Sequence, residues 1–190
     1  MEGEDAPALR VERILGALQE QGVKYVLVGG VAGTYHGASR ATTDVDICPA
    51  WDQENLRRLA EALRSLGALE KGGRVMPDAQ LIHSREVTNW RSPFGDVDVL
   101  LGIPEKSQNE RAQYRKLAED ALVVEVGTDS VLVASLPALI RSKEIADRQK
   151  DHEALPELRA LEAAQRSQQP RPPQARTNGP TAVSDRGQER

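Results

Sequence analysis

Apolar residues recur along the chain at two different spacings, which predict a mixture of helices and strands. Over residues 9–18 they follow the 3.6-residue period of an amphipathic helix, and Gly22 is placed to end it. The same period over residues 56–66 predicts the clearest helix of the chain, with Asp52 in position to cap its first turn. Each of these segments presents one apolar face to a core.

Runs rich in β-branched residues predict the strands. The strongest are Val23–Val28, which Gly29 and Gly30 close, then Asp44–Cys48 and Phe94–Leu101. Leu81–His83 and Glu86–Trp90 are weaker strand candidates, and the segments 122–126 and 131–134 predict a hairpin across Gly127.

Shorter helices are predicted over residues 31–35, 107–121 and 150–164, and from Ser135 through Lys143. The order of elements predicts an α/β (α+β) domain over residues 9–166, with a mixed sheet flanked by helices and with C-terminal helices. Residues 1–8 are expected to be a flexible N-terminus. Residues 167–190 are rich in Gln, Pro, Arg, Ser and Gly, which predicts a disordered tail.

The composition favours a soluble, cytoplasmic protein. The chain has 190 residues, of which 39% are hydrophobic, so it is long enough for one core. Its single cysteine, Cys48, excludes an intramolecular disulfide framework and is expected to be a small buried hydrophobe. No apolar run approaches the ~18 residues of a membrane span. The net charge of -4 argues against nucleic-acid binding over the whole surface but allows a local basic groove.

Two aspartates carry the clearest chemical signal. Asp44 and Asp46 flank Val45 in a predicted strand, so both carboxylates project from one face while Val45 and Ile47 face the other. At an effective dielectric of 20, two such charges ~4 Å apart repel by roughly 4 kcal/mol. A divalent cation that prefers oxygen ligands would remove this repulsion. The sequence therefore predicts a Mg²⁺ or Mn²⁺ site on this strand.

A second pair, Asp96 and Asp98, has the same arrangement in a later strand. One of its members can complete a three-carboxylate site of the kind that phosphoryl and nucleotidyl transfer require. Asp98 is the expected third carboxylate because apolar residues flank it on both sides, whereas Asp96 follows Gly95 at the start of the strand. Asp96 stays open as the alternative.

The order of these motifs resembles the nucleotidyltransferase superfamily with the DNA-polymerase-β-like fold. That family has an apolar residue and two small residues, then an Asp-x-Asp strand, then one more acidic residue between hydrophobes. The matching segments are Val28-Gly29-Gly30, Asp44-Val45-Asp46 and Val97-Asp98-Val99. Small bacterial members, including AbiEii-type toxins, are similar also in Arg40, Thr42 and Thr43 and in the pattern of residues 136–151.

The resemblance implies a role for each matching residue. Gly29 and Gly30 would let the backbone approach a triphosphate, and Asp44, Asp46 and Asp98 would hold the metal, with Asp98 helping to deprotonate the acceptor hydroxyl. The residues that the resemblance implies to contact the nucleotide are Gly29, Gly30, Arg40, Thr43, Lys143 and Arg148.

Each of these residues also has a purely structural interpretation. The glycines can form a simple tight turn, and the aspartates can be a solvated strand face. Lys143 can pair with Asp147 on a helix surface, and Arg148, Lys150 and Asp151 can belong to a solvated helix face. His36 is expected at a helix end with a backbone partner.

The function implied is transfer of a nucleoside monophosphate from a nucleoside triphosphate such as ATP to an acceptor hydroxyl. The acceptor is an RNA or tRNA end, a protein side chain or a small molecule. The family also implies a toxin–antitoxin or phage-defence role, with a cognate antitoxin or regulatory protein as partner, and no membrane partner. The alternative is a catalytically inactive nucleotide-binding or partner-binding module of the same fold.

Overall fold

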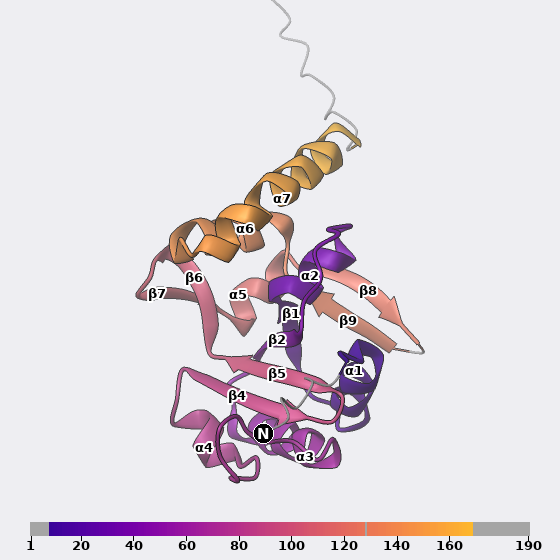
Figure 1. Ribbon diagram of the computed structural model, residues 1–190, viewed down its shortest axis with the longest axis vertical. Coiled ribbons are helices and arrows are strands. Elements are labelled where there is room, and N and C mark those ends of the chain that lie inside the picture. Colours follow the sequence, from indigo (N-terminus) through magenta and orange to yellow (C-terminus); the bar gives the residue numbers. More distant parts are fainter. Residues whose placement is uncertain (1–7, 128, 169–190) are drawn as a thin grey trace, which may run out of the picture.

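The computed structural model describes residues 8–127 and 129–168. Its centre is a mixed seven-stranded sheet with the strand order β3-β4-β5-β2-β1-β9-β8 (Figure 1). The strands of this sheet are β1 (Tyr25–Val28), β2 (Asp44–Pro49), β3 (Leu69–Glu70), β4 (Val87–Ser92), β5 (Gly95–Leu100), β8 (Leu122–Val126) and β9 (Asp129–Val133). A separate hairpin joins β6 (Gly102–Ser107) to β7 (Glu110–Gln113).

The helices lie at both ends of this sheet. They are α1 (Val11–Glu20), α2 (Gly29–Tyr35), α3 (Gln53–Ser65), α4 (Ala79–His83), α5 (Tyr114–Glu119), α6 (Leu136–Ala146) and α7 (Gln149–Gln168). Helices α3 and α4 lie at the end of the molecule opposite to α6 and α7, with the sheet between them (Figure 1). The mixed sheet flanked by helices confirms the predicted fold class. No helix in the described ranges is long and apolar enough to cross a membrane.

Alternation along β2 and β5 decides which way the aspartates point. Val45, Ile47, Val97 and Val99 are 0% exposed and belong to the main core. Since successive side chains of a strand point to opposite faces, the aspartates between them lie on the face away from that core. The two strands pair in parallel, and the register places Asp46 beside Asp98.

Helices α6 and α7 are joined by a small apolar cluster of their own. It contains Leu136 and Ile140 from α6 and Leu155 and Leu158 from α7. This packing fixes the two helices as one unit, which stands across the sheet from α3 and α4 (Figure 1).

Several predicted elements are confirmed. The hairpin of β8 and β9 forms as expected. Helix α3 begins where predicted, because the Asp52 carboxylate accepts the backbone N–H of Asn55 at 2.9 Å. Cys48 is fully buried. Residues 167 and 168, the predicted start of the tail, belong to the last turn of α7. The rest of the predicted tail, residues 169–190, and residues 1–7 of the predicted flexible N-terminus lie outside the described residues.

Two predicted elements are wrong. Leu81–His83 is helical instead of extended, because the Asp78 carboxylate accepts the N–H groups of Gln80 and Leu81 at 2.8 and 3.2 Å and starts α4. Residues 107–121 do not form one helix, since Glu110–Gln113 pairs with β6 and only Tyr114–Glu119 is helical.

Candidate functional site

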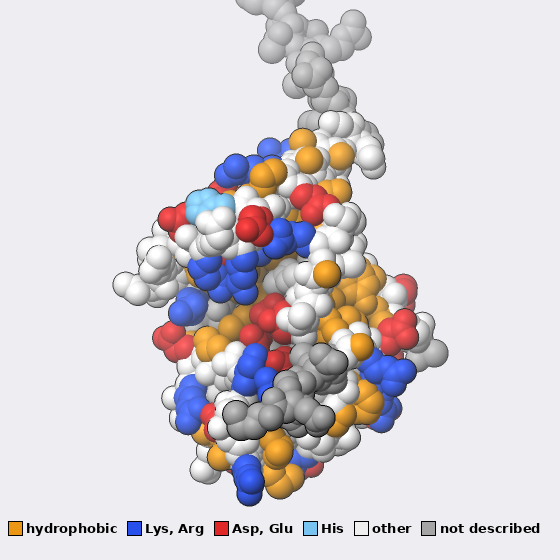
Figure 2. Space-filling view, viewed as in Figure 1, with side chains coloured by type: hydrophobic (Ala, Val, Ile, Leu, Met, Phe, Trp, Pro, Cys, Tyr) orange, Lys and Arg blue, Asp and Glu red, His pale blue; other side chains and the backbone are white. Residues whose placement is uncertain are grey.

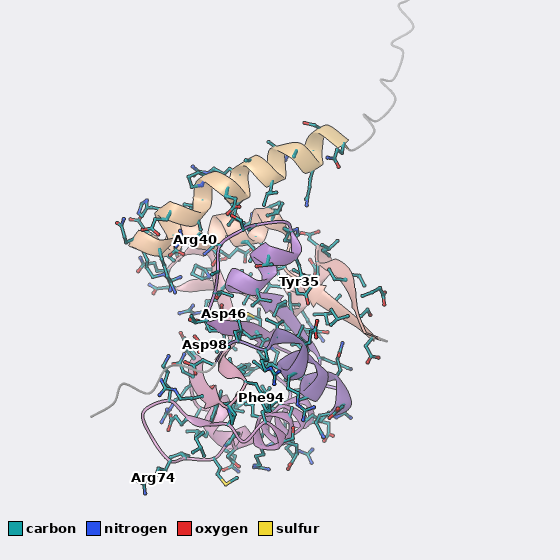
Figure 3. The ribbon with its side chains drawn as sticks, turned by 45° about the vertical axis from the view of Figure 1, so that its right-hand side comes forward. Tyr35, Arg40, Asp46, Arg74, Phe94 and Asp98 are labelled. Carbon is teal, nitrogen blue, oxygen red and sulfur yellow. The ribbon has the colours of Figure 1, made fainter. Side chains whose placement is uncertain are left out.

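Three carboxylates from two neighbouring strands meet at one place on the open face of the sheet. Asp44 and Asp46 come from β2 and Asp98 from β5, and each offers an oxygen within 4.8 Å of the others. Figure 3 shows Asp46 and Asp98 close together, with Arg40 nearer to α7. The convergence follows from the parallel register of β2 and β5, which sets Asp46 directly opposite Asp98.

Asp96 projects from the same face but has different partners. Its carboxylate lies 2.8 Å from the Lys71 ammonium and 3.6 Å from the Arg91 Nε. The Asp96 carboxylate is therefore paired with these two cations and does not belong to the three-carboxylate group. The geometry therefore brings Asp98, and not Asp96, together with Asp44 and Asp46.

Two of the three carboxylates, those of Asp46 and Asp98, sit in an environment that disfavours their charge. Burial, followed by the neighbouring carboxylates of Asp44 and Asp98, raises the pKa of Asp46 to about 7. Burial also raises the pKa of Asp98, against the effect of a hydrogen bond from Asn89. Three oxygen ligands that repel one another are suited to a hard divalent cation such as Mg²⁺, whose remaining ligands are usually waters and phosphates. The group can therefore hold a metal ion.

We expect the Asp46→Asn variant, in chelator at pH 8, to be more stable than the wild type. Asparagine keeps the shape of the side chain and removes the charge that burial and two carboxylates oppose, which should raise the free energy of unfolding by about 1 to 3 kcal/mol. Thermal melts in EDTA measure the difference. The Asp120→Asn variant, at an exposed position of the chain, is the control and should melt like the wild type. A lower melting temperature for Asp46→Asn would contradict the repulsion.

The glycine pair that precedes the aspartates makes room for them. Gly29 has φ +67°, and a Cβ at this position would lie 1.8 Å from the Asp46 Oδ2. A Cβ on Gly30 would lie 2.7 Å from the Thr42 side chain. The Gly30 backbone also lowers the pKa of the Asp46 carboxyl, against the effect of burial. The two glycines are therefore more than a tight turn, because any side chain at Gly29 displaces one of the three carboxylates.

The Gly29→Ala variant should lose the response of the protein to metal. Alanine is strained at this positive φ, at a cost of roughly 1 kcal/mol or more, and its methyl group occupies the place of the Asp46 carboxylate. We expect the Mg²⁺-dependent rise in melting temperature to disappear. The Gly127→Ala variant is the matched control, because Gly127 has the same φ of +67° and no described residue beyond its chain neighbours lies within 4 Å of its Cβ position. An Mg²⁺ response in Gly29→Ala equal to that of Gly127→Ala would contradict the role of Gly29.

Of the two threonines before the aspartates, Thr42 contacts the carboxylate group. Its hydroxyl donates to the Asp44 Oδ1 at 2.7 Å. Thr43, which the resemblance placed in the nucleotide site, is exposed and does not line the cavity beside the carboxylates.

A cavity of about 490 Å³ opens beside the carboxylates. Its sheet side includes Gly29, Gly30 and the three aspartates, and its other side is formed by α6, α7 and the segment before β2. Basic side chains line that second side. They are Arg40, Lys143, Arg148 and Lys150, with Arg111 from β7. Acidic side chains accordingly gather at the centre of the face shown in Figure 2, with basic side chains on both sides of them.

A buried carboxylate holds two of these cations in place. The Asp151 side chain is fully buried and lies 3.2 Å from the Lys143 Nζ and 2.7 Å from the Arg148 Nε. Although burial acts in the other direction, these hydrogen bonds keep the pKa of Asp151 below its ordinary value. The predicted alternative of a Lys143–Asp147 surface pair is wrong, because Asp147 pairs with His152 instead.

The segment between α2 and β2 is attached to α7. Arg40 lies 2.9 Å from the Glu153 carboxylate, and the backbone N–H and hydroxyl of Ser39 both donate to Glu157 at 2.8 Å. His36 lies at the end of α2 with its Nε2 2.8 Å from the Ala134 carbonyl oxygen, as predicted. These contacts place Arg40 at the cavity but leave it shared with Glu153.

Sequence reasoning did not assign Asn89, Arg111 or Lys150 to the site. Asn89 lies opposite Asp98 in the β4–β5 register, so the alternation of Glu86–Trp90 could have placed it on the aspartate face. Arg111 lies on β7, which was not predicted. For Lys150 the sequence allowed either a solvated helix face or the site. In the structure Lys150 lines the cavity and lowers the pKa of Asp46.

Comparison with known proteins gives likeness in structure only. No family model and no curated protein sequence matches the chain. The lincosamide antibiotic adenylyltransferase LnuA, bound to lincomycin, is 15% identical, with a TM-score of 0.55 over 81% of this chain and 99% of LnuA. An antigenic nucleotidyltransferase-like protein from Paracoccidioides brasiliensis is 18% identical, with a TM-score of 0.52 over 82% of this chain and 79% of that protein. The chain therefore has the fold of the nucleotidyltransferases.

Proposed function

We propose that this protein is a metal-dependent nucleotidyltransferase that moves a nucleoside monophosphate from a nucleoside triphosphate to an acceptor hydroxyl. One observation carries the proposal: Asp44, Asp46 and Asp98 converge within 4.8 Å at a cavity whose opposite side is basic. Carboxylates that hold cations and basic groups that hold phosphates are the two parts that this chemistry requires.

Asp44, Asp46 and Asp98 are the proposed ligands of Mg²⁺, and Mn²⁺ suits the same oxygen donors. The bound cations supply neutralisation of the charge that develops on the phosphates. Thr42 orients Asp44 through its 2.7 Å hydrogen bond, and the missing Cβ of Gly29 leaves room for Asp46.

The basic side of the cavity is the proposed triphosphate site. Lys143 and Arg148, held by Asp151, present two cations there, and Arg40 adds a third if it exchanges Glu153 for phosphate. Gly29 and Gly30 line the same cavity, where backbone without a Cβ suits close approach of a phosphate.

The reaction follows from this placement. The acceptor oxygen forms a bond to the α-phosphorus, the bond to the pyrophosphate oxygen breaks, and the acceptor proton passes to Asp98. Pyrophosphate leaves past Lys143 and Arg148, which neutralise its charge.

The acceptor is an RNA end, a protein side chain or a small molecule, and ATP is one of the four candidate donors. A toxin–antitoxin or phage-defence role, with a partner protein, stays a prediction from the family resemblance. The three aspartates favour catalysis over the alternative of an inactive binding module, because a module that only binds a partner does not need three ligands for one cation.

Incubation with each of the four nucleoside triphosphates, labelled at the α-phosphate, tests the proposal. The protein, Mg²⁺ and a cell extract are combined, and label is then measured in RNA, protein and small molecules. We expect transfer from at least one nucleotide, and none in EDTA or with the Asp44→Asn/Asp46→Asn double variant. Absence of label with all four nucleotides would overturn catalysis and favour the binding module.

A further inference from the structure

The sheet continues beyond the carboxylates as a face that is open to solvent. In the β4–β5 register Asn89 lies beside Asp98, Arg91 beside Asp96, and Val87 beside Leu100. Because side chains alternate, Val87, Asn89 and Arg91 share the face of the aspartates. Val87 is 40% exposed, and Val87, Asn89 and Leu100 also line the cavity. The cavity therefore extends from Asp98 onto the face of β4.

Two cations stand on this face next to the carboxylates. Lys71 follows β3 and is held beside β4 by a 2.8 Å hydrogen bond from its backbone N–H to the Asn89 carbonyl oxygen. Its side chain is 50% exposed and that of Arg91 is 56% exposed, while that of Asp96, which both of them contact, is 19% exposed. Two cations share one carboxylate, so the group of Lys71, Arg91 and Asp96, here called the β4 basic group, carries a net positive charge.

The β4 basic group and the proposed triphosphate site lie on different sides of Asp98. Lys143 and Arg148 belong to α6 and its junction with α7, whereas Lys71 and Arg91 belong to the β3–β4 part of the sheet, on the far side of β5 from β2 (Figure 1). Lys71 and Arg91 both contact Asp96, which lies two residues from Asp98 on the same face of β5. A group bound by Lys71 and Arg91 therefore lies beside the carboxylate that is proposed to take the acceptor proton.

We propose that the β4 basic group binds a phosphate of the acceptor, so that the acceptor is a polynucleotide end with its free hydroxyl at Asp98. The inference rests on the proposed function and adds the class of acceptor to it. In a terminal nucleotide the 3′-hydroxyl and the 5′-phosphate are carried by one ribose, which matches a basic group that lies next to the catalytic carboxylate. Arginine and lysine are the side chains that hold such phosphates.

The charge on this face disfavours the other acceptors. A cationic amino sugar would meet Lys71 and Arg91 with like charge, and it would find Asp96 already neutralised by both. The hydroxyl of a protein side chain is neutral, so it offers no negative charge for the two exposed cations beside Asp98 to bind. Val87 and Leu100 complete the face with an apolar surface, on which a ribose or base can pack.

Binding of a single-stranded RNA octamer with a 5′-fluorophore and a free 3′-hydroxyl tests the inference without any transfer. Fluorescence anisotropy is measured with Mg²⁺ and without nucleoside triphosphate. The Lys71→Gln/Arg91→Gln variant should bind about 10-fold more weakly, and the slope of log Kd against log salt should fall by roughly 1 to 2. The Arg57→Gln/Arg58→Gln variant removes the same charge from exposed positions on α3 and should bind within about twofold of the wild type. Equal loss in both double variants would overturn the proposal.

The Asp96→Asn variant gives a prediction of opposite sign. Removing this carboxylate frees Lys71 and Arg91, so RNA binding should tighten several-fold while the Mg²⁺-dependent rise in melting temperature stays. Weaker RNA binding by Asp96→Asn would overturn the proposal. Loss of the Mg²⁺ response would show that Asp96 is a metal ligand, which also overturns it.

Two further arms identify the source of the phosphate and separate this inference from the proposed function. If adenosine 5′-monophosphate displaces the octamer and adenosine does not, one phosphate is sufficient for binding. If neither of them displaces the octamer, binding requires a polynucleotide chain. Label that enters protein at equal rates in the wild type and in Lys71→Gln/Arg91→Gln would overturn the RNA acceptor and leave nucleotidyl transfer standing. RNA binding that depends on Lys71 and Arg91 without transfer of any label would support the surface and overturn the function.

Discussion

Exchanging Asp44 and Asp46 together for asparagine is expected to reduce nucleotidyl transfer by roughly a thousandfold or more while leaving the fold intact. A bound cation contributes several kcal/mol to such a transition state, and each ~1.4 kcal/mol corresponds to a factor of ten in rate. Asparagine preserves the volume of both side chains on β2, whose core-facing residues Val45 and Ile47 are unchanged. Initial rates with labelled nucleotide measure the loss, and circular dichroism and thermal melts measure the fold.

The binding of metal to this variant separates a catalytic defect from a structural one. In the wild type Mg²⁺ should raise the melting temperature, because a ligand that binds only the folded state stabilises it by RT ln(1 + [L]/Kd). The double variant should show no such rise, and the Asp120→Asn variant should show the full rise. Transfer at the wild-type rate by a folded double variant would refute the proposed mechanism.

The two strands that carry the aspartates could be predicted because their signal is local. Alternation of aspartate with valine or isoleucine defines both the strand and its two faces, and the buried state of Val45, Ile47, Val97 and Val99 confirms it. Helix α3 was equally clear, since its periodicity and its Asp52 cap agree. Where the signal was mixed, as at residues 107–121, pairing of Glu110–Gln113 with the preceding strand β6 decided the structure.

The local sequence pattern alone could not decide between Asp96 and Asp98 as the third carboxylate. Both follow the same local rule, and both lie on the same face of β5. The order of strands decides between them, because β4 and the residue after β3 bring Arg91 and Lys71 to Asp96. Lys71 lies outside every helix and strand predicted from the sequence, so its position beside the carboxylates depends entirely on tertiary structure.

The basic side of the cavity likewise depends on the ion pairs of Asp151, which the spacing of residues along the sequence does not reveal. Lys143 and Arg148 were expected near the nucleotide from the resemblance, with a surface helix pair as the alternative. The structure instead places both on Asp151, which the chain buries where α6 passes into α7. Asp147 adopts φ 51° at the end of α6, and this turn brings the first turn of α7 back beside Lys143.

Replacing Asp151 by asparagine is therefore expected to lower both the stability of the protein and its affinity for nucleotide. Removing one partner of a buried ion pair leaves the other charges uncompensated, which destabilises a protein by about 3 to 5 kcal/mol when all partners are buried. Lys143 is 18% exposed, but Arg148 is 59% exposed and can regain water. We expect a loss of about 2 to 4 kcal/mol in the free energy of unfolding, measured by urea denaturation.

The dependence of this loss on pH distinguishes an ion pair from a packing defect. The pKa of Asp151 lies below its ordinary value of 3.8 in the folded protein, so the carboxylate contributes stability above pH 3.8 and loses it as the pH falls through the lowered pKa. The difference between wild type and Asp151→Asn should be constant from pH 5 to 8 and shrink below about pH 4. A difference that is the same at pH 3 and pH 7 would show that only packing has changed.

The Asp147→Asn variant is the matched control, because it makes the same exchange four residues away. Asp147 is 69% exposed, its one ion-pair partner among the described residues is His152, and asparagine tolerates its left-handed backbone. It should leave stability within about 0.5 kcal/mol of the wild type. Nucleotide affinity, measured by calorimetry with Mg²⁺, should fall in Asp151→Asn alone, because Lys143 and Arg148 then lose the carboxylate that directs both of them to the cavity.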